Sequence, residues 1–145
     1  MLFAYGTLQD PDILGAVLGR VVDLTGLQPA HAQGYKAVAY PGRPYPALVP
    51  SPGATTAGRA IGRLSAADWT ALDAFEGEEY SRASIELAVC SFTLPVHAYF
   101  PIIATPPHGP AWRLDDWTIR HKPSVLAAET ALAKALRDRL ASATQ

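Results

Sequence analysis

The order of the predicted elements indicates an α+β protein built on a curved or closed mixed sheet with two or three packed helices. A strand and a helix come first, several strands and a second helix follow, and a hairpin and a last helix complete the order. Because strands and helices do not alternate regularly, a doubly wound parallel sheet is not expected. The 145 residues, 49% of them apolar, predict a single domain over residues 1–145.

The first predicted unit is a short buried strand, a turn and a helix. Residues 2–5 form an apolar run that ends at Gly6, as a buried strand would. Asp10 is a good N-cap, and Pro11 suits the first helical position. Apolar residues then recur at helical spacing until Gly19.

The middle of the chain predicts strands that are interrupted by prolines. Residues 35–40 are typical of a strand, whereas residues 41–44 (Pro-Gly-Arg-Pro) exclude regular structure. Residues 45–49 are expected to form a short edge strand between prolines. Residues 58–64 form a further predicted strand, with a bend or bulge at its two glycines.

A second helix is predicted after Ser65. Ser65 and Asp68 have the spacing of a capping box, with Asp in place of the usual Glu or Gln. Trp69, Leu72 and Phe75 then lie on one face, as in an amphipathic helix. Gly77 stands where a glycine would end that helix.

The last predicted elements are a hairpin and a long helix. Tyr80–Val89 alternates apolar and polar residues, which indicates a half-buried strand, and residues 94–100 are its predicted partner. Residues 124–140 are expected to form the final helix. The side chains expected to be buried there are Val125, Ala128, Leu132 and Leu136.

Charge and composition exclude several classes of protein. With 12 basic and 13 acidic residues, the net charge of −1 gives no electrostatic footprint for nucleic acid or an anionic membrane. No run of 18 apolar residues predicts a membrane span, and no basic residue precedes Arg20 as a secretory signal would need. The single cysteine cannot form an internal disulfide. We therefore expect a cytoplasmic protein that binds neither nucleic acid nor membrane.

No metal, cofactor or nucleophile motif is recognisable. The four histidines lack metal-ligand spacing, and one cysteine cannot make a thiolate site. The sequence contains neither a Gly-x-Ser-x-Gly elbow nor a phosphate-binding glycine loop. Cys90 falls at the predicted hairpin turn with no histidine or asparagine beside it, which favours a small, partly buried thiol over a nucleophile.

The turn after the first strand is one candidate for chemistry. Tyr5-Gly6-Thr7-Leu8 would expose a row of backbone N–H groups just before a helix. Glycine lets a ligand approach closely, and a helix start favours negative charge. A carboxylate or an oxyanion could bind there. The alternative is an ordinary connection between a strand and a helix.

Glu76 is the second candidate. It ends the predicted helix directly after Phe75, so its side chain would start near the core. The negative end of the helix dipole, nearby carboxylates and burial would all raise its pKa. Such a carboxylate is a good general base near neutral pH. The alternative is a solvated acidic turn formed by Glu76, Glu78 and Glu79.

Together these segments resemble the gamma-glutamylcyclotransferase-like superfamily, in particular its AIG2-like and gamma-glutamylamine cyclotransferase branch. That branch has Tyr-Gly-Ser/Thr-Leu after the first strand, Glu-Gly after an amphipathic helix, and Tyr-x-Arg shortly afterwards. The resemblance covers roughly residues 2–100, and the order and spacing of the motifs make it specific. The matching residues are Tyr5-Gly6-Thr7-Leu8, Tyr45-Pro46, Glu76-Gly77 and Tyr80-Ser81-Arg82.

The resemblance implies a gamma-glutamylcyclotransferase-like fold, a small mixed β-barrel with flanking helices, and a reaction that needs no cofactor or metal. The α-amine of a γ-glutamyl amine or γ-glutamyl amino acid attacks its own γ-amide carbonyl. The products are 5-oxoproline and a free amine. Glu76 would be the general acid and base, and the N–H groups of residues 5–8 would bind the substrate carboxylate or the developing oxyanion.

Three further residues are weaker candidates for substrate binding. Tyr45, Tyr80 and Arg82 match the family motifs and would line or orient the pocket. Packing in the core is the alternative for Tyr80, and an ion pair with a nearby glutamate is the alternative for Arg82. A binding module for a small carboxylated metabolite, or hydrolysis on the same scaffold, are the competing functions. The leaving amine and the oligomeric state stay open.

The prolines are concentrated in two places. Ten of the 13 prolines fall in residues 41–52 and 95–110. The first stretch contains Tyr45-Pro46, and the second follows the hairpin, where the resemblance fades. Proline fixes φ, so such loops would shape a pocket at little ordering cost. We expect both stretches on the rim of the substrate pocket.

Overall fold

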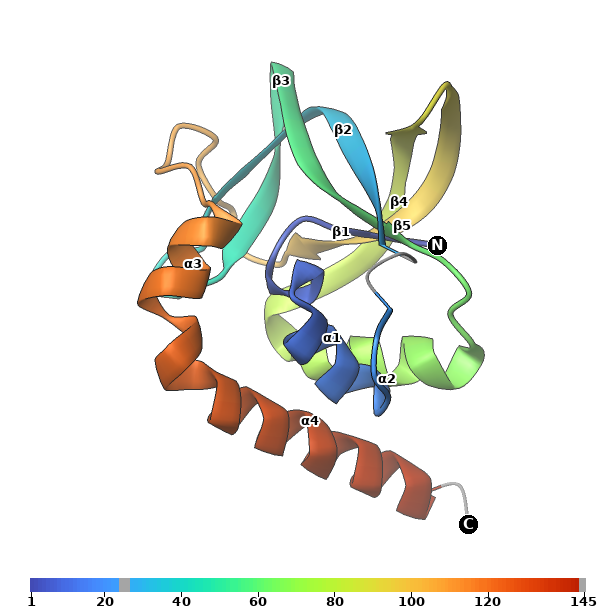
Figure 1. Cartoon of the computed structure of the whole chain (residues 1–145). Coiled ribbons are helices and arrows are strands. Elements are labelled where there is room, and N and C mark those ends of the chain that lie inside the picture. The colour runs from blue at the N-terminus through green and yellow to red at the C-terminus, as the bar shows by residue number, and fades with distance from the viewer. Residues whose placement is uncertain (24–26, 144–145) are drawn as a thin grey trace.

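In the part of the chain that the structure describes, five strands close into a small barrel, and four α-helices lie to one side of it (Figure 1). The computed structural model describes residues 1–23 and 27–143. The first and last strands meet in parallel, and the other neighbouring strands are antiparallel. The predicted α+β class with a mixed barrel is therefore confirmed. The order around the barrel is β1 (Leu2–Ala4), β3 (Pro46–Ile61), β2 (Leu27–Ala39), β4 (Tyr80–Val89) and β5 (Phe92–Pro101).

Strand β3 is one continuous strand where the sequence predicted two. It pairs with β2 almost throughout, and the register shifts between Gln33 and Tyr35 of β2. At that shift, residues 51–54 of β3 have no paired partner on β2. Pro52 lies in this stretch, so its missing N–H costs no ladder hydrogen bond. The separation into two short strands was wrong because the bulge accommodates the proline.

Gly58 lets two strands approach closely at the seam of the barrel. A Cβ atom at this position would lie 2.4 Å from the carbonyl oxygen of Ala4 and 2.6 Å from the ring of Phe3. Only glycine leaves room for β1 to pair with β3 here. Gly62, the other glycine of the predicted bend, lies beyond the end of β3 at Ile61.

Helix α1 (Pro11–Leu18) begins and ends as its sequence predicts. The Asp10 carboxylate accepts hydrogen bonds from the N–H groups of Asp12 and Ile13 at 2.9 and 3.2 Å. Gly19 ends the helix in the left-handed conformation, with φ of 73°. The short β1 strand therefore leads into a rigid helix within a few residues.

Helix α2 (Ala66–Glu76) also follows its prediction. Ser65 and Asp68 form the complete capping box. The same aspartate receives both guanidinium nitrogens of Arg20, at 2.7 and 2.9 Å. This ion pair fixes the start of α2 beside the end of α1, and the far end of α2 presents Glu76.

The last two helices are α3 (Leu114–Arg120) and α4 (Lys122–Ala143). Figure 1 shows α4 running past α1 and α2 on the side away from the barrel. Its predicted buried face is half right: Val125 packs against the core and Leu136 is partly buried, but Ala128 is exposed and Leu132 is 48% exposed. The buried residue of this helix is Ala133. A narrow stripe of α4 packs on the helices, while Leu132 lines a cavity. None of the described helices has the length and apolarity to cross a membrane.

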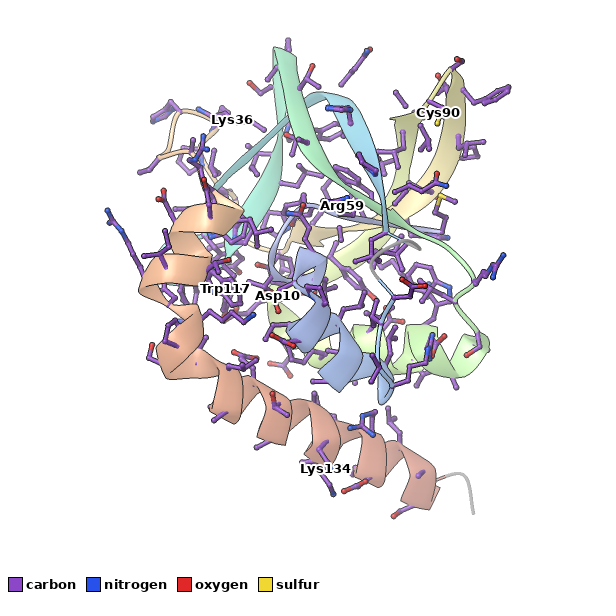
Figure 2. The ribbon with its side chains drawn as sticks, viewed as in Figure 1. Asp10, Lys36, Arg59, Cys90, Trp117 and Lys134 are labelled. Carbon is purple, nitrogen blue, oxygen red and sulfur yellow. The ribbon has the colours of Figure 1, made fainter. Side chains whose placement is uncertain are left out.

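Apolar side chains fill the barrel and the space between the barrel and the helices. Phe3, Leu48 and Leu87 belong to the cluster inside the barrel. Leu14 and Leu72 belong to the cluster under the helices. At the far tip of the β4–β5 hairpin, Cys90 is exposed rather than partly buried (Figure 2).

Candidate active site

A cavity of about 370 Å³ lies between the barrel and the helices. This volume falls within the range of small-molecule sites. Its walls are residues 5–8 after β1, residues 44–46 before β3, residues 74–80 at the end of α2, and parts of α3 and α4. The turn after β1 and Glu76 therefore face the same space.

The backbone of residues 5–8 provides hydrogen-bond donors to this cavity. These residues lead into the 3₁₀ helix η1 (Thr7–Gln9). Among the hydrogen bonds of the described residues, none is donated by the N–H groups of Gly6, Thr7 or Leu8. A Cβ atom on Gly6 would lie 2.9 Å from Pro46, so the close packing of this turn requires glycine. The turn can offer several N–H groups to one anion.

The side chain of Tyr5 has a structural task. Its hydroxyl group donates to the carbonyl of Tyr99 at 2.6 Å and accepts from the N–H of Leu48 at 3.2 Å. These bonds link the end of β1 to β5 and β3. Burial raises the pKa of the Tyr5 hydroxyl well above its usual value, so this group stays protonated. Because the Tyr5 hydroxyl group is engaged within the protein, the backbone of Tyr5 is the part of this residue that remains for contact with a ligand.

Glu76 is the last residue of α2 and lines the cavity. The residue is partly exposed, but its carboxyl group lies in a strongly desolvated environment. Burial raises the pKa of Glu76 to about 8, and the negative charges of Glu129 and Glu79 contribute. No lysine, arginine or histidine is among the described residues that line the cavity. Glu76 can thus exchange a proton near neutral pH.

A polar network closes one edge of the cavity. The hydroxyl group of Tyr45 donates to the carboxylate of Glu79, which also accepts from Arg43 Nε at 2.8 Å. These partners lower the pKa of Glu79, although burial opposes them. Burial and the same carboxylate raise the pKa of Tyr45 to about 12. The loop before β3 is thereby tied to the 3₁₀ helix η3 (Gly77–Glu79).

Tyr80 joins this edge from the start of β4. Its hydroxyl group donates to the carbonyl of Pro46 at 2.6 Å. Its ring lies 5.5 Å from that of Tyr40 and 6.0 Å from that of Tyr45, measured between centroids. Tyr80 also lines the cavity, so this residue both packs against neighbouring tyrosines and forms part of the pocket wall.

Arg82 lies outside the cavity lining. Its Nε atom is 3.2 Å from the Asp73 carboxylate, and its guanidinium group lies 4.5 Å from the centre of the Trp69 ring. The partner is therefore a residue of α2, one turn before Glu76. Of the eight residues singled out from the sequence, the structure brings seven to the cavity, and the eighth is Arg82.

The part of the second proline-rich stretch that follows the hairpin, from residue 101 on, does not line the cavity either. Trp112 donates from its backbone to Ala37 at 3.1 Å, and the N–H of Ala39 donates to Pro110 at 2.8 Å, which fixes the stretch along β2. The indole Nε1 of Trp112 donates to the carbonyl of Pro44 at 2.8 Å. The expectation that this stretch lies on the rim of the substrate pocket was therefore wrong. The stretch packs against the first proline-rich loop and lines a separate, open pocket together with it.

Helices α3 and α4 supply a wall that the sequence motifs did not reveal. Figure 2 shows Trp117 on the α3 side of the molecule and Lys134 on α4, away from the barrel. The sequence contained one signal for this wall: Glu129 falls at helical spacing among apolar residues of α4 and interrupts an otherwise apolar helix face. The residues of this wall are Trp117, Val125, Glu129, Leu132 and Leu136.

Comparison with known proteins gives a consistent match. The family described as gamma-glutamyl cyclotransferase, AIG2-like, matches residues 2–118. AIG2-like protein A of Arabidopsis thaliana is 30% identical over 83% of this chain and 73% of its own length. AIG2-like protein B of the same plant is 28% identical over 94% of this chain and 80% of its own length.

Two solved structures have a similar fold. Both are solution structures of proteins from Arabidopsis thaliana, and both matches cover 88% of this chain. One has a TM-score of 0.67 at 25% identity and is covered over 77% of its length. The other has a TM-score of 0.66 at 28% identity and is covered over 85%. The similarity therefore includes most of the barrel and its helices.

Proposed function

The chain belongs to the AIG2-like gamma-glutamyl cyclotransferase family, and we propose that it converts a γ-glutamyl amine or γ-glutamyl amino acid into 5-oxoproline and a free amine. The observation that carries this proposal is the shared cavity of Glu76 and the backbone donors of residues 5–8. The family name suggests activity of this type. The resemblance implies the role of Glu76, and the cavity that it shares with residues 5–8 supports that role.

The reaction needs one C–N bond formed and one broken. The α-amine nitrogen of the substrate attacks the γ-carbonyl carbon and closes a five-membered ring. Glu76 takes a proton from the attacking nitrogen and returns it to the nitrogen of the leaving amine, whose bond to carbon then breaks. Nucleophile and electrophile belong to one molecule, so holding the folded conformer lowers much of the barrier.

The acidity of Glu76 suits this proton transfer. Its pKa of about 8 lies much closer to that of an amine than the ordinary value of 4.5 for a glutamate does. The cost of moving a proton between the two groups is therefore smaller than for an ordinary carboxylate. A general acid and base matched in this way typically contributes roughly 10²–10⁴-fold in rate.

Binding of the substrate carboxylate falls to the backbone of residues 5–8. The four tyrosine hydroxyl groups that line the cavity all donate to acceptors within the protein. No basic side chain lines the cavity among the described residues. The unused N–H groups of Gly6, Thr7 and Leu8 are therefore the donors assigned to the carboxylate.

A panel of γ-glutamyl amines and γ-glutamyl amino acids tests the proposal, with 5-oxoproline as the measured product. We expect Glu76→Gln to lose about 10²–10⁴-fold in kcat. Glu86→Gln, which removes an exposed carboxylate on β4, is the matched control and should retain turnover. Equal turnover by Glu76→Gln and the wild-type protein would refute the assigned role. Release of glutamate instead of 5-oxoproline would indicate a hydrolase, and binding without turnover would indicate a binding module.

A further inference from the structure

Glu76 depends on the backbone of α2 for its position. Among the described residues, its side chain accepts no hydrogen bond and forms no ion pair. It is also the last residue of the helix, and helix ends commonly fray. General acid–base catalysis requires the two groups that exchange a proton to lie within hydrogen-bond reach. The last turn of α2 must therefore be fixed against the barrel by other contacts.

Asp73, one turn before Glu76, makes such a contact. Its Oδ1 atom accepts a hydrogen bond from the Tyr99 hydroxyl group at 2.7 Å and lies 3.2 Å from Arg82 Nε. Tyr99 on β5 and Arg82 on β4 are direct partners in the ladder of the hairpin. Opposite residues place their side chains on the same face of a sheet, so the hairpin presents both donors to one carboxylate. The register of the hairpin thus determines where Asp73 docks.

Trp69 extends this contact along α2. Residues 69, 73 and 76 follow one another at helical spacing and therefore share one stripe of the helix. The Arg82 guanidinium group lies 4.5 Å from the centre of the Trp69 ring, so it contacts two successive turns of this stripe. The Trp69 ring also meets the ring of His97 on β5 edge-on, at 5.4 Å between centroids. Both strands of the hairpin therefore hold the stripe up to the turn that carries Glu76.

Tyr99 connects the docked helix to the turn after β1. Its hydroxyl group binds Asp73, and its carbonyl accepts the Tyr5 hydroxyl group at 2.6 Å. Burial and the Asp73 carboxylate raise the pKa of Tyr99, so its hydroxyl group remains a donor. Asp73 and Arg82 are both absent from the lining of the cavity. Any effect of these two residues on turnover must therefore pass through the residues that they hold.

We propose that Asp73 and Arg82 are positioning residues for Glu76. Their ion pair, with the Tyr99 hydrogen bond, docks the last turns of α2 on the hairpin. The Glu76 carboxylate is thereby held in place opposite the backbone donors of residues 5–8. The inference rests on the proposed function and deepens it, because it gives Arg82 a role in turnover without contact with the substrate. Since the backbone donors bind the substrate, loss of the ion pair should lower kcat and leave KM unchanged.

Two substitutions that change the charge in opposite directions test this role. Asp73→Asn removes a negative charge, and Arg82→Gln removes a positive one. We expect both to lower kcat by about tenfold to a hundredfold, because a displacement of about 1 Å can cost that much. KM should stay within about twofold of the wild-type value. The double variant should lose no more than the more affected single variant, because the two residues act as a unit.

The exposed ion pair of Lys134 and Asp138 on α4 provides matched controls. Lys134→Gln and Asp138→Asn make the same changes in charge and should keep the wild-type kcat. Tyr99→Phe removes the other donor to Asp73 without a change in charge and should lower kcat as well. Urea denaturation establishes that each variant is folded in the assay. The Asp73 side chain is 43% exposed and asparagine has its shape, so Asp73→Asn tests the inference even if Arg82→Gln does not fold.

Four outcomes would count against this role. A wild-type kcat in Asp73→Asn and Arg82→Gln overturns it, even if both variants are less stable, because the ion pair would then be merely structural. A loss that appears only as a higher KM overturns it as well. Opposite shifts of the pH profile at an unchanged maximal rate would show that the two charges act on the ionisation of Glu76 and not on its position. Absence of 5-oxoproline from every compound with the wild-type protein refutes the proposed function, and the inference falls with it.

Discussion

Replacement of Glu76 by glutamine should change how the stability of the protein depends on pH. Folding raises the pKa of this carboxyl group from the ordinary 4.5 to about 8. Between these values the folded protein holds a proton that the unfolded chain has released. Unfolding therefore releases a proton in this window, and the free energy of unfolding falls as the pH rises.

The size of this change in stability follows from the change in the pKa of Glu76 on folding. Each pKa unit corresponds to about 1.36 kcal/mol, so a shift from 4.5 to about 8 amounts to about 5 kcal/mol at most. Between pH 5 and pH 9, the carboxyl group should remove about 4 kcal/mol of stability from the wild-type protein. This is a large share of the total for a domain, typically about 5–15 kcal/mol.

Urea denaturation at pH 5, 7 and 9 measures this difference. Glutamine cannot ionise, so Glu76→Gln should match the wild-type protein at pH 5 and exceed it by about 4 kcal/mol at pH 9. Glu86→Gln, whose carboxylate is exposed, should follow the wild-type curve. Parallel curves for Glu76→Gln and the wild-type protein would mean that Glu76 ionises without cost in the folded state. The reasoning from burial would then be refuted, whatever the activity of the protein.

Three further substitutions test the packing that positions the site. Gly58→Ala should lower the free energy of unfolding by at least about 2 kcal/mol, because its methyl group would lie 2.4 Å from the Ala4 carbonyl oxygen; an unchanged melting temperature would contradict this. Tyr5→Phe leaves two buried backbone groups without their partner and should cost about 1–3 kcal/mol in urea denaturation, whereas no loss would show that they find other partners. Trp112→Phe removes the hydrogen bond to Pro44, so hydrogen exchange at the Arg43 amide should accelerate; equal exchange rates would refute the support assigned to the indole.

Local signals predicted the helix ends because caps depend on residues that are close in sequence. Asp10 before Pro11, and Ser65 before Asp68, satisfy backbone N–H groups within the first turn of each helix. The packed face of α4 could not be predicted in this way. Its apolar residues fit several faces at helical spacing, and contact with α1 and α2 chooses among them.

The candidate site, too, could be predicted from the sequence only where the signals are local. The pattern around Glu76 indicated a carboxylate near the core, and the turn between the first strand and helix indicated backbone donors at residues 5–8. Glu129 carries no motif, and a glutamate on a helix is usually solvated. Arg82 matched a motif, yet the turn from α2 to β4 brings it to Asp73 instead of the cavity. Such pairings depend on the closed barrel and cannot be derived from spacing alone.

The wall that α4 contributes makes this helix sensitive to whatever occupies the cavity. A molecule that touches both the barrel and the residues around Leu132 adds contacts that the empty protein lacks. By thermodynamic linkage, a ligand at 100 times its Kd stabilises the state that binds it by about 2.7 kcal/mol. Opening of α4 away from α1 would forfeit that free energy. Amide exchange along residues 122–143 thus becomes a reporter of occupancy, because bound ligand slows the detachment of the helix.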